Sequence, residues 1–311
     1  MKPFGMLFIL SVLLTACTTV TSTIYPTANA SPLPMASPTF TPTFTLASAL
    51  TETPSASPPT KDFSLILYRR YLSRFYEFQV IGGVQNGEWL TSAVVADQVR
   101  FEQSFDIYAP DGFTGVAVTK DYSIPLVSVP GGEIFIGSDF SKDIPNLIGL
   151  AQGWDVTYRP SQELSVNAPV YQQVVRDWLI SQNISDPDVR ISRILRVDLE
   201  GDGVDEVLIS ASRFIEESGH MTEAGDYSII LMRKVMGNEV VTVPVIADIY
   251  TSSPAELTFP FTYSLANLLD LNRDGILELI VGVTRWEGNG VMIYEVEGGS
   301  TVQVIKEISS E

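Results

Sequence analysis

Two acidic stretches of the chain hold the residues whose types and spacing are best suited to chemistry. The first is VDLEGDGVDEVLI, residues 197–209, and the second is LDLNRDGILELIVG, residues 269–282. The first stretch crowds five carboxylates into residues 198–206 and then continues into an apolar, β-branched run. Carboxylates this close repel one another, so the loop must either remain solvated or contain something that offsets the repulsion.

The two stretches are copies of one pattern, D-x-[E/N]-x-D-G-x-x-E, placed 72 residues apart. The similarity extends beyond the loops, because Arg213 and Arg285, each followed by an aromatic residue, lie at the same distance behind them. Each copy then has a glycine-containing turn between two apolar runs. We therefore expect an internal repeat, with units at about 188–250 and 260–308 that each form a strand, an acidic loop, a strand and a hairpin.

This pattern predicts a metal site in each loop. Oxygens at positions one, three and five of such a loop point inward, glycine at position six allows the turn, position seven offers its carbonyl and position nine closes the shell. Calcium takes six to eight oxygen ligands at about 2.4 Å, and its charge removes the repulsion. The expected cofactor is a structural Ca²⁺, and its expected ligands are Asp198, Glu200, Asp202, Val204 and Glu206 in the first loop and Asp270, Asn272, Asp274, Ile276 and Glu278 in the second.

A metal-free alternative is a pair of Asx turns, in which side-chain oxygens accept hydrogen bonds from nearby main-chain amides. An EF-hand is excluded, because it needs an acid at position twelve and a helix after the loop. Position twelve is Ile209 in one copy and Val281 in the other, and the residues around them favour a strand.

The loops resemble those of FG-GAP and VCBS repeats, found in integrin-α-like β-propellers, where a calcium loop joins two strands of a blade. The resemblance covers residues 188–308 and implies two blade-like repeats with calcium loops. Glu200 departs from the family, which usually has Asp or Asn there, and Arg273 places a cation inside the second loop, which should weaken that site. A propeller has four to eight blades, so two units are not expected to complete one.

The predicted fold class is mainly β with one or two helices (α+β). Residues 62–165 are expected to form a β-rich domain, in which three turn signals separate apolar runs: Asn86-Gly87, Pro110-Asp111-Gly112 and Pro130-Gly131-Gly132. Residues 166–311 are expected to contain a helix followed by the two repeats.

Helical periodicity marks the start of that second region. Asn167 is expected to cap the helix, and Pro169 suits its first turn. Apolar residues then recur at helical spacing, which predicts packing against a sheet: Tyr171, Val174, Val175, Trp178 and Leu179.

The N-terminal residues have the features of an export signal. Met1-Lys2 is followed by an apolar run that is too short to span a bilayer. The run ends in Leu14-Thr15-Ala16-Cys17, which resembles the lipobox of bacterial lipoproteins. That resemblance implies a signal peptide over 1–16 and a lipidated Cys17; the alternative is an ordinary secretion signal. Residues 17–61 are rich in Thr, Ser and Pro and are expected to form a disordered tether.

The net charge and the residue counts argue against several classes of function. The net charge of −18 argues against a nucleic-acid partner, because phosphate binding needs Lys and Arg patches, and the one cysteine excludes an internal disulfide. No catalytic residue is predicted, because His220 is the only histidine and no nucleophile elbow or zinc-binding helix accompanies it. We expect a lipoprotein anchored through Cys17 in the cell membrane or outer envelope, with an extracytoplasmic, calcium-stabilised binding or scaffold module for an extracellular protein or glycan. The alternatives are an extracytoplasmic hydrolase acting on glycan or peptide, and a component of envelope assembly.

Overall fold

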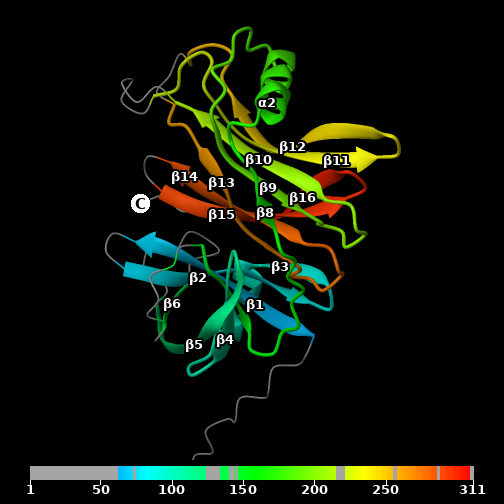
Figure 1. The fold of residues 1–311 in the computed structure, drawn as a ribbon. Coiled ribbons are helices and arrows are strands. Elements are labelled where there is room, and N and C mark those ends of the chain that lie inside the picture. Colours follow the sequence, from blue (N-terminus) through cyan, green and yellow to red (C-terminus); the bar gives the residue numbers. More distant parts are fainter. Residues whose placement is uncertain are drawn as a thin grey trace, which may run out of the picture. The chain divides into compact units, whose positions relative to one another are not determined.

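A computed structural model of the chain describes most of the region after residue 61 (Figure 1). The described residues are 62–72, 75–123, 134–138, 140, 144, 146–214, 221–254, 258–285 and 288–308. The predicted signal peptide, Cys17, the predicted tether, the predicted turn at Pro130-Gly131-Gly132 and His220 lie outside them. The chain divides into two units, Met1–Ser55 and Ala56–Glu311, and everything below concerns the second.

The predicted class is confirmed, since the described residues are mainly β and form three antiparallel sheets. They contain two short α-helices, α1 (Ser92–Val95) and α2 (Pro169–Ser181), and a 3-10 turn at Ala96–Gln98. Neither of these helices has the length and apolar character that crossing a membrane requires.

The first sheet is built from the strands that precede residue 152. Its order is β1-β7-β4-β5-β6-β2-β3, and β1 also pairs with β2. Two predicted turns are confirmed: Asn86-Gly87, both with positive φ, joins β2 to β3, and Pro110-Asp111 joins β4 to β5. The strands are β1 (Phe63–Leu72), β2 (Phe75–Gln85), β3 (Glu88–Thr91), β4 (Ser104–Ala109), β5 (Gly112–Ser123), β6 (Ile134–Ser138) and β7 (Ile148–Ala151).

The second and third sheets each contain one copy of the acidic loop. The second has the order β12-β11-β10-β9-β8 and the third has the order β13-β14-β15-β16. In both, the acidic loop joins the first two strands of the unit and a hairpin follows, which is the order that the repeat predicts. The strands are β8 (Gln162–Glu163), β9 (Ile191–Val197), β10 (Glu206–Arg213), β11 (Tyr227–Met236), β12 (Glu239–Ile249), β13 (Thr262–Leu269), β14 (Glu278–Arg285), β15 (Gly288–Glu297) and β16 (Ser300–Ile308).

Helix α2 packs on the second sheet as its apolar stripe predicts. Val175 and Leu179 are fully buried against the sheet, and the other stripe residues pack around them. The expected cap at Asn167 is wrong. The capping position is Ala168, which makes no side-chain cap, and the Asn167 amide donates to Ser165 Oγ at 3.3 Å instead. Pro169 begins the helix with a fixed φ and no unsatisfied N–H, so a capping side chain is less needed there.

Apolar clusters join these elements in a stack of layers (Figure 1). One cluster lies between α2 and the second sheet, another between the second and third sheets, and a third between the third and first sheets. A fourth lies within the first sheet. The middle strands are therefore covered on both faces, which explains why β11 and β14 begin with runs of buried residues rather than an alternating pattern.

Candidate metal centre

The two acidic loops start and end at the same place in their sheets. The last residue before each loop, Val197 or Leu269, pairs with the acid that closes it, Glu206 or Glu278. Both glutamates are buried at the first position of the outgoing strand. The glycine at position six has a left-handed φ in both loops, 86° and 89°, so the predicted requirement for glycine at the turn is confirmed.

In the first loop, main-chain amides surround the leading aspartate. Asp198 Oδ1 accepts hydrogen bonds from the amides of Gly201 (2.6 Å) and Asp202 (3.2 Å), and Oδ2 accepts one from Gly203 (3.0 Å). Asp202 Oδ1 accepts the amide of Val204 at 2.8 Å. The contact between Asp202 and Val204 is an Asx turn, whereas the amides bound to Asp198 come from three to five residues further along the loop. Together these contacts stabilise both carboxylates with donors from the protein.

A lysine supplies positive charge to the same loop. Lys234 on β11 places its Nζ 2.5 Å from Glu200 Oε2, and its side chain is only 11% exposed. Burial raises the pKa of Glu206, whereas the Leu199 amide, which donates to Glu206 Oε2 at 2.9 Å, and the charge of Lys234 lower it. The predicted ligands Glu200 and Glu206 are thus both within the influence of one ammonium group.

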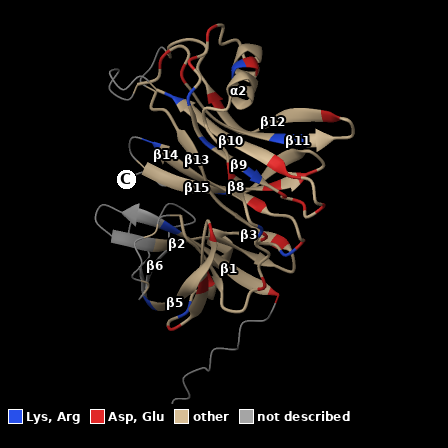
Figure 2. Cartoon of the chain, viewed as in Figure 1, with Lys and Arg blue, Asp and Glu red and all other residues tan. Residues whose placement is uncertain are grey.

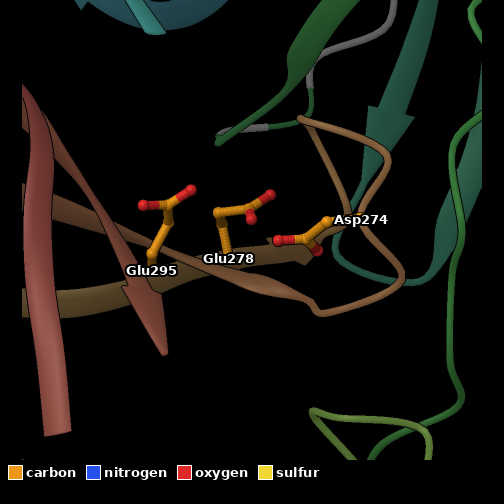
Figure 3. A group of neighbouring side chains, drawn as sticks. All are labelled: Asp274, Glu278 and Glu295. Carbon is orange, nitrogen blue, oxygen red and sulfur yellow. The ribbon is translucent and has the colours of Figure 1, made fainter. Parts of the chain in front are cut away.

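In the second loop, carboxylates converge. Oxygens of Asp274, Glu278 and Glu295 all lie within 4.8 Å of one another. Figure 3 shows the carboxylate of Glu278 between those of the other two. Two of the three were predicted as ligands. Glu295 was missed, because it lies on β15 and no fixed spacing in the sequence relates it to the loop.

Hydrogen bonds hold the added glutamate in position. Glu295 Oε1 accepts from Trp89 Nε1 at 2.6 Å and from Asn272 Nδ2 at 2.8 Å. Asn272 Nδ2 also donates to Asp274 Oδ2 at 3.1 Å, and Asn272 Oδ1 accepts the amide of Asp274. Asn272 therefore presents its amide nitrogen to the cluster, and its predicted role as an oxygen ligand stays a prediction. Trp89 ties the first sheet to this site.

Asp270 is buried, and the Thr157 side chain and the Arg273 amide lie close enough to lower the pKa of its carboxyl. The residue is 2% exposed, and its Oδ2 accepts the amide of Gly275 at 3.0 Å. Its Oδ1 is buried and receives no hydrogen bond of normal geometry from the described residues. Leaving a buried charged acceptor unsatisfied costs free energy, and a cation beside it would remove that cost. The donor set of this loop therefore fits a hard metal ion.

The raised pKa values of the buried acids also favour a bound cation. Burial is the largest cause that raises the pKa of Glu278, the charges of Asp274, Asp270 and Glu295 add to the rise, and the amide of Leu271 opposes it, so that the pKa is raised to about 9. Burial also raises the pKa of Asp270. Without a cation, Glu278 therefore retains a proton at neutral pH, and a divalent ion would displace it.

The remaining loop residues have structural contacts. Ile276 donates its amide to Asp274 Oδ1 at 2.8 Å, as Val204 does to Asp202. Arg273 has φ 69° and places its guanidinium over the Trp154 ring at 4.8 Å. The guanidinium of Arg273 thus contacts the face of the Trp154 ring. The weaker metal binding that we expect from its positive charge in the second loop stays a prediction.

An arginine joins the two loops to each other. Arg159 donates from Nη1 to the carbonyl of Leu199 at 2.9 Å and from Nη2 to the carbonyl of Gly275 at 2.7 Å. The amide of Leu277 donates to the same Leu199 carbonyl at 2.9 Å. The two loops therefore lie side by side.

Cavities reach the second loop from two sides. One of about 530 Å³ has Asp62, Trp154, Asp274 and Glu295 among its lining residues. Another of about 330 Å³ has Glu200, Asp274, Glu278 and Glu295 in its lining. Figure 2 shows acidic residues at the ends of the second and third sheets where the loops lie, so a cation can approach the carboxylates through solvent.

No protein-family model, no curated protein and no solved structure matches this chain. The resemblance to FG-GAP and VCBS repeats therefore rests on the loop residues themselves.

Stability in the absence of metal should depend on pH through Glu278. Its folded-state pKa is raised above the ordinary value of 4.5, so between pH 4.5 and about 9 the folded chain retains a proton that the unfolded chain releases. In chelator, the contribution of Glu278 to the free energy of unfolding should fall as pH rises through this window, by up to about 1.4 kcal/mol per pH unit. Urea unfolding at several pH values measures it.

The variant Glu278→Gln should lose this part of the pH dependence, because an amide cannot release the proton. Glu239→Gln, at an exposed position, is the matched control and should keep the wild-type profile. Parallel profiles for wild type and Glu278→Gln would show that Glu278 has no raised pKa.

Proposed function

We propose that the chain is a surface-anchored lipoprotein whose β-rich ectodomain is stabilised by calcium and serves as a binding or scaffold module. The observation that carries the calcium proposal is the second loop, in which Asp274, Glu278 and Glu295 converge beside the unsatisfied Oδ1 of Asp270. The oxygen donors are those that calcium prefers. An extracellular protein or glycan is the proposed ligand class.

We further propose that the two loop-containing sheets are blade-like repeats that do not complete a propeller. The shared order of strand, acidic loop, strand and hairpin supports this, as does the large apolar cluster between the two sheets. In the proposed arrangement, the cation fixes the bend between β13 and β14, and the core fixes the packing of one unit on the next.

The carboxylates of the cavity support a cation site better than a hydrolase. A hydrolase calls for a concave site with two carboxylates that are free of the loops. In the cavity of about 530 Å³, Asp62 and Glu295 lie outside the loops. Glu295, however, accepts hydrogen bonds from Trp89 and Asn272 and belongs to the acidic cluster, so it is better placed to hold a cation than to transfer a proton.

Calcium should raise the melting temperature of the protein. At about 100 times the dissociation constant, one bound ion stabilises by about 2.7 kcal/mol, which corresponds to roughly 5–10 °C for a region of this size. Thermal unfolding is followed by circular dichroism in calcium and in chelator. Asp274→Asn with Glu278→Gln should abolish the shift, whereas Glu239→Gln should retain it. Superimposable wild-type curves would sink the calcium proposal.

Membrane attachment should depend on Cys17, because the thiol is the proposed site of acylation. In a bacterial host, the wild-type protein should fractionate with membranes and partition into detergent, and Cys17→Ser should not. Thr19→Ser, two residues away, is the matched control. Recovery of wild type and Cys17→Ser in the same soluble fraction would argue for an ordinary secreted protein.

A further inference from the structure

We infer that the two loops carry different cations: the second binds a divalent metal ion with Glu295 as an added ligand, and the first binds no metal because the ammonium group of Lys234 stands in its place. This inference rests on the proposed calcium dependence and assigns it to one loop.

Strand register determines which residue faces the closing acid of each loop. In the third sheet, Leu279 pairs with Tyr294, so the next step of the ladder sets Glu278 opposite Glu295. In the second sheet, Val207 pairs with Arg233, so the next step sets Glu206 opposite Lys234. The position that faces the closing acid thus carries a negative charge in one repeat and a positive charge in the other.

In the second loop this register adds a carboxylate to a site already rich in them. Glu295 joins Asp274 and Glu278 within 4.8 Å. Asp270 Oδ1, in a residue that is 2% exposed, makes no hydrogen bond of normal geometry with the described residues, although the Thr157 side chain and the Arg273 amide lie close enough to lower the pKa of this carboxyl. Its other oxygen accepts the amide of Gly275, which closes the same loop, so the carboxylate lies on the inside of the loop. Buried charges require a partner of opposite sign, and a divalent ion would serve as that partner.

In the first loop, a side chain of the protein itself supplies the positive charge that the acids require. Lys234 Nζ lies 2.5 Å from Glu200 Oε2 and is largely withdrawn from solvent. Both oxygens of Asp198 accept main-chain amides, which leaves them engaged where Asp270 Oδ1 is not. A metal ion placed among these acids would have to displace the ammonium group or share the site with it, and two cations repel each other.

The length of the Glu200 side chain allows its contact with Lys234. Its side chain is one methylene longer than that of Asn272, the corresponding residue of the second loop, and it reaches the lysine on β11. The corresponding residue of the second loop, Asn272, turns its amide nitrogen toward Glu295 instead. Each residue at position three is therefore matched to the group on the neighbouring strand.

Charge exchange between the two positions tests the inference. Bound calcium is counted by equilibrium dialysis and isothermal titration on the metal-free protein. Wild type should bind one ion. Glu295→Lys should bind none, and its melting temperature should be the same in calcium and in chelator. Lys234→Glu should bind two, because the ammonium group is then gone and a carboxylate faces the closing acid in both repeats. Glu239→Lys and Lys306→Glu, at exposed positions, are the matched controls and should each bind one.

A conservative variant covers the case in which a charge reversal fails to fold. Glu295→Gln should fold and weaken calcium binding by about tenfold or more, since even indirect partners of a metal contribute that much. An unchanged dissociation constant in Glu295→Gln would overturn the role of Glu295. Two ions on the wild type would overturn the inference while leaving the calcium proposal intact, and no bound ion would remove both.

Discussion

The mutual repulsion of buried carboxylates is the constraint on which the structure around the two loops depends. Glu278 and Asp270 lie almost wholly inside the protein; Glu278 is grouped with the exposed Asp274 and the half-buried Glu295, and the charge of Asp270 acts on Glu278. Such a group of acids is tolerated only with protons, donors or a cation among them. The first loop supplies main-chain amides and the ammonium of Lys234. The second supplies main-chain amides and the side chains of Asn272 and Trp89 and, in our proposal, takes calcium.

The polar contacts that hold the acidic loops also join the layers of the fold. The loop of the third sheet is held by Trp89 from the first sheet, through Glu295, and by Arg159, which reaches the carbonyls of both loops. Apolar clusters pack the sheets against one another, and these polar contacts fix the positions of the two loops. A cation in the second loop would therefore act on the junction of three sheets, which is why we expect its removal to lower the stability of the whole unit.

Much of the architecture could be predicted from residues near one another in the sequence. The turn at Asn86-Gly87, the stripe of α2 and the order of strand, loop, strand and hairpin all depend on local pattern or on the repeat. The site could be predicted only in part, since Glu295 and Lys234 are defined by register across a strand pair and Trp89 is separated from Glu295 by 206 residues. The cap at Asn167 failed because the helix begins one residue later than a side-chain cap there would need. Repeat similarity predicts two equal loops, and the contrast between Glu295 and Lys234 is visible only once the strands are paired.

Long-wavelength anomalous diffraction from crystals grown with calcium would locate the ion directly. The proposed arrangement requires one peak at about 2.3–2.6 Å from carboxylate oxygens of Asp274, Glu278 and Glu295, and no peak among Asp198, Asp202 and Glu206. A peak in the first loop, or carboxylates of the second loop turned outward with no ion between them, would contradict it.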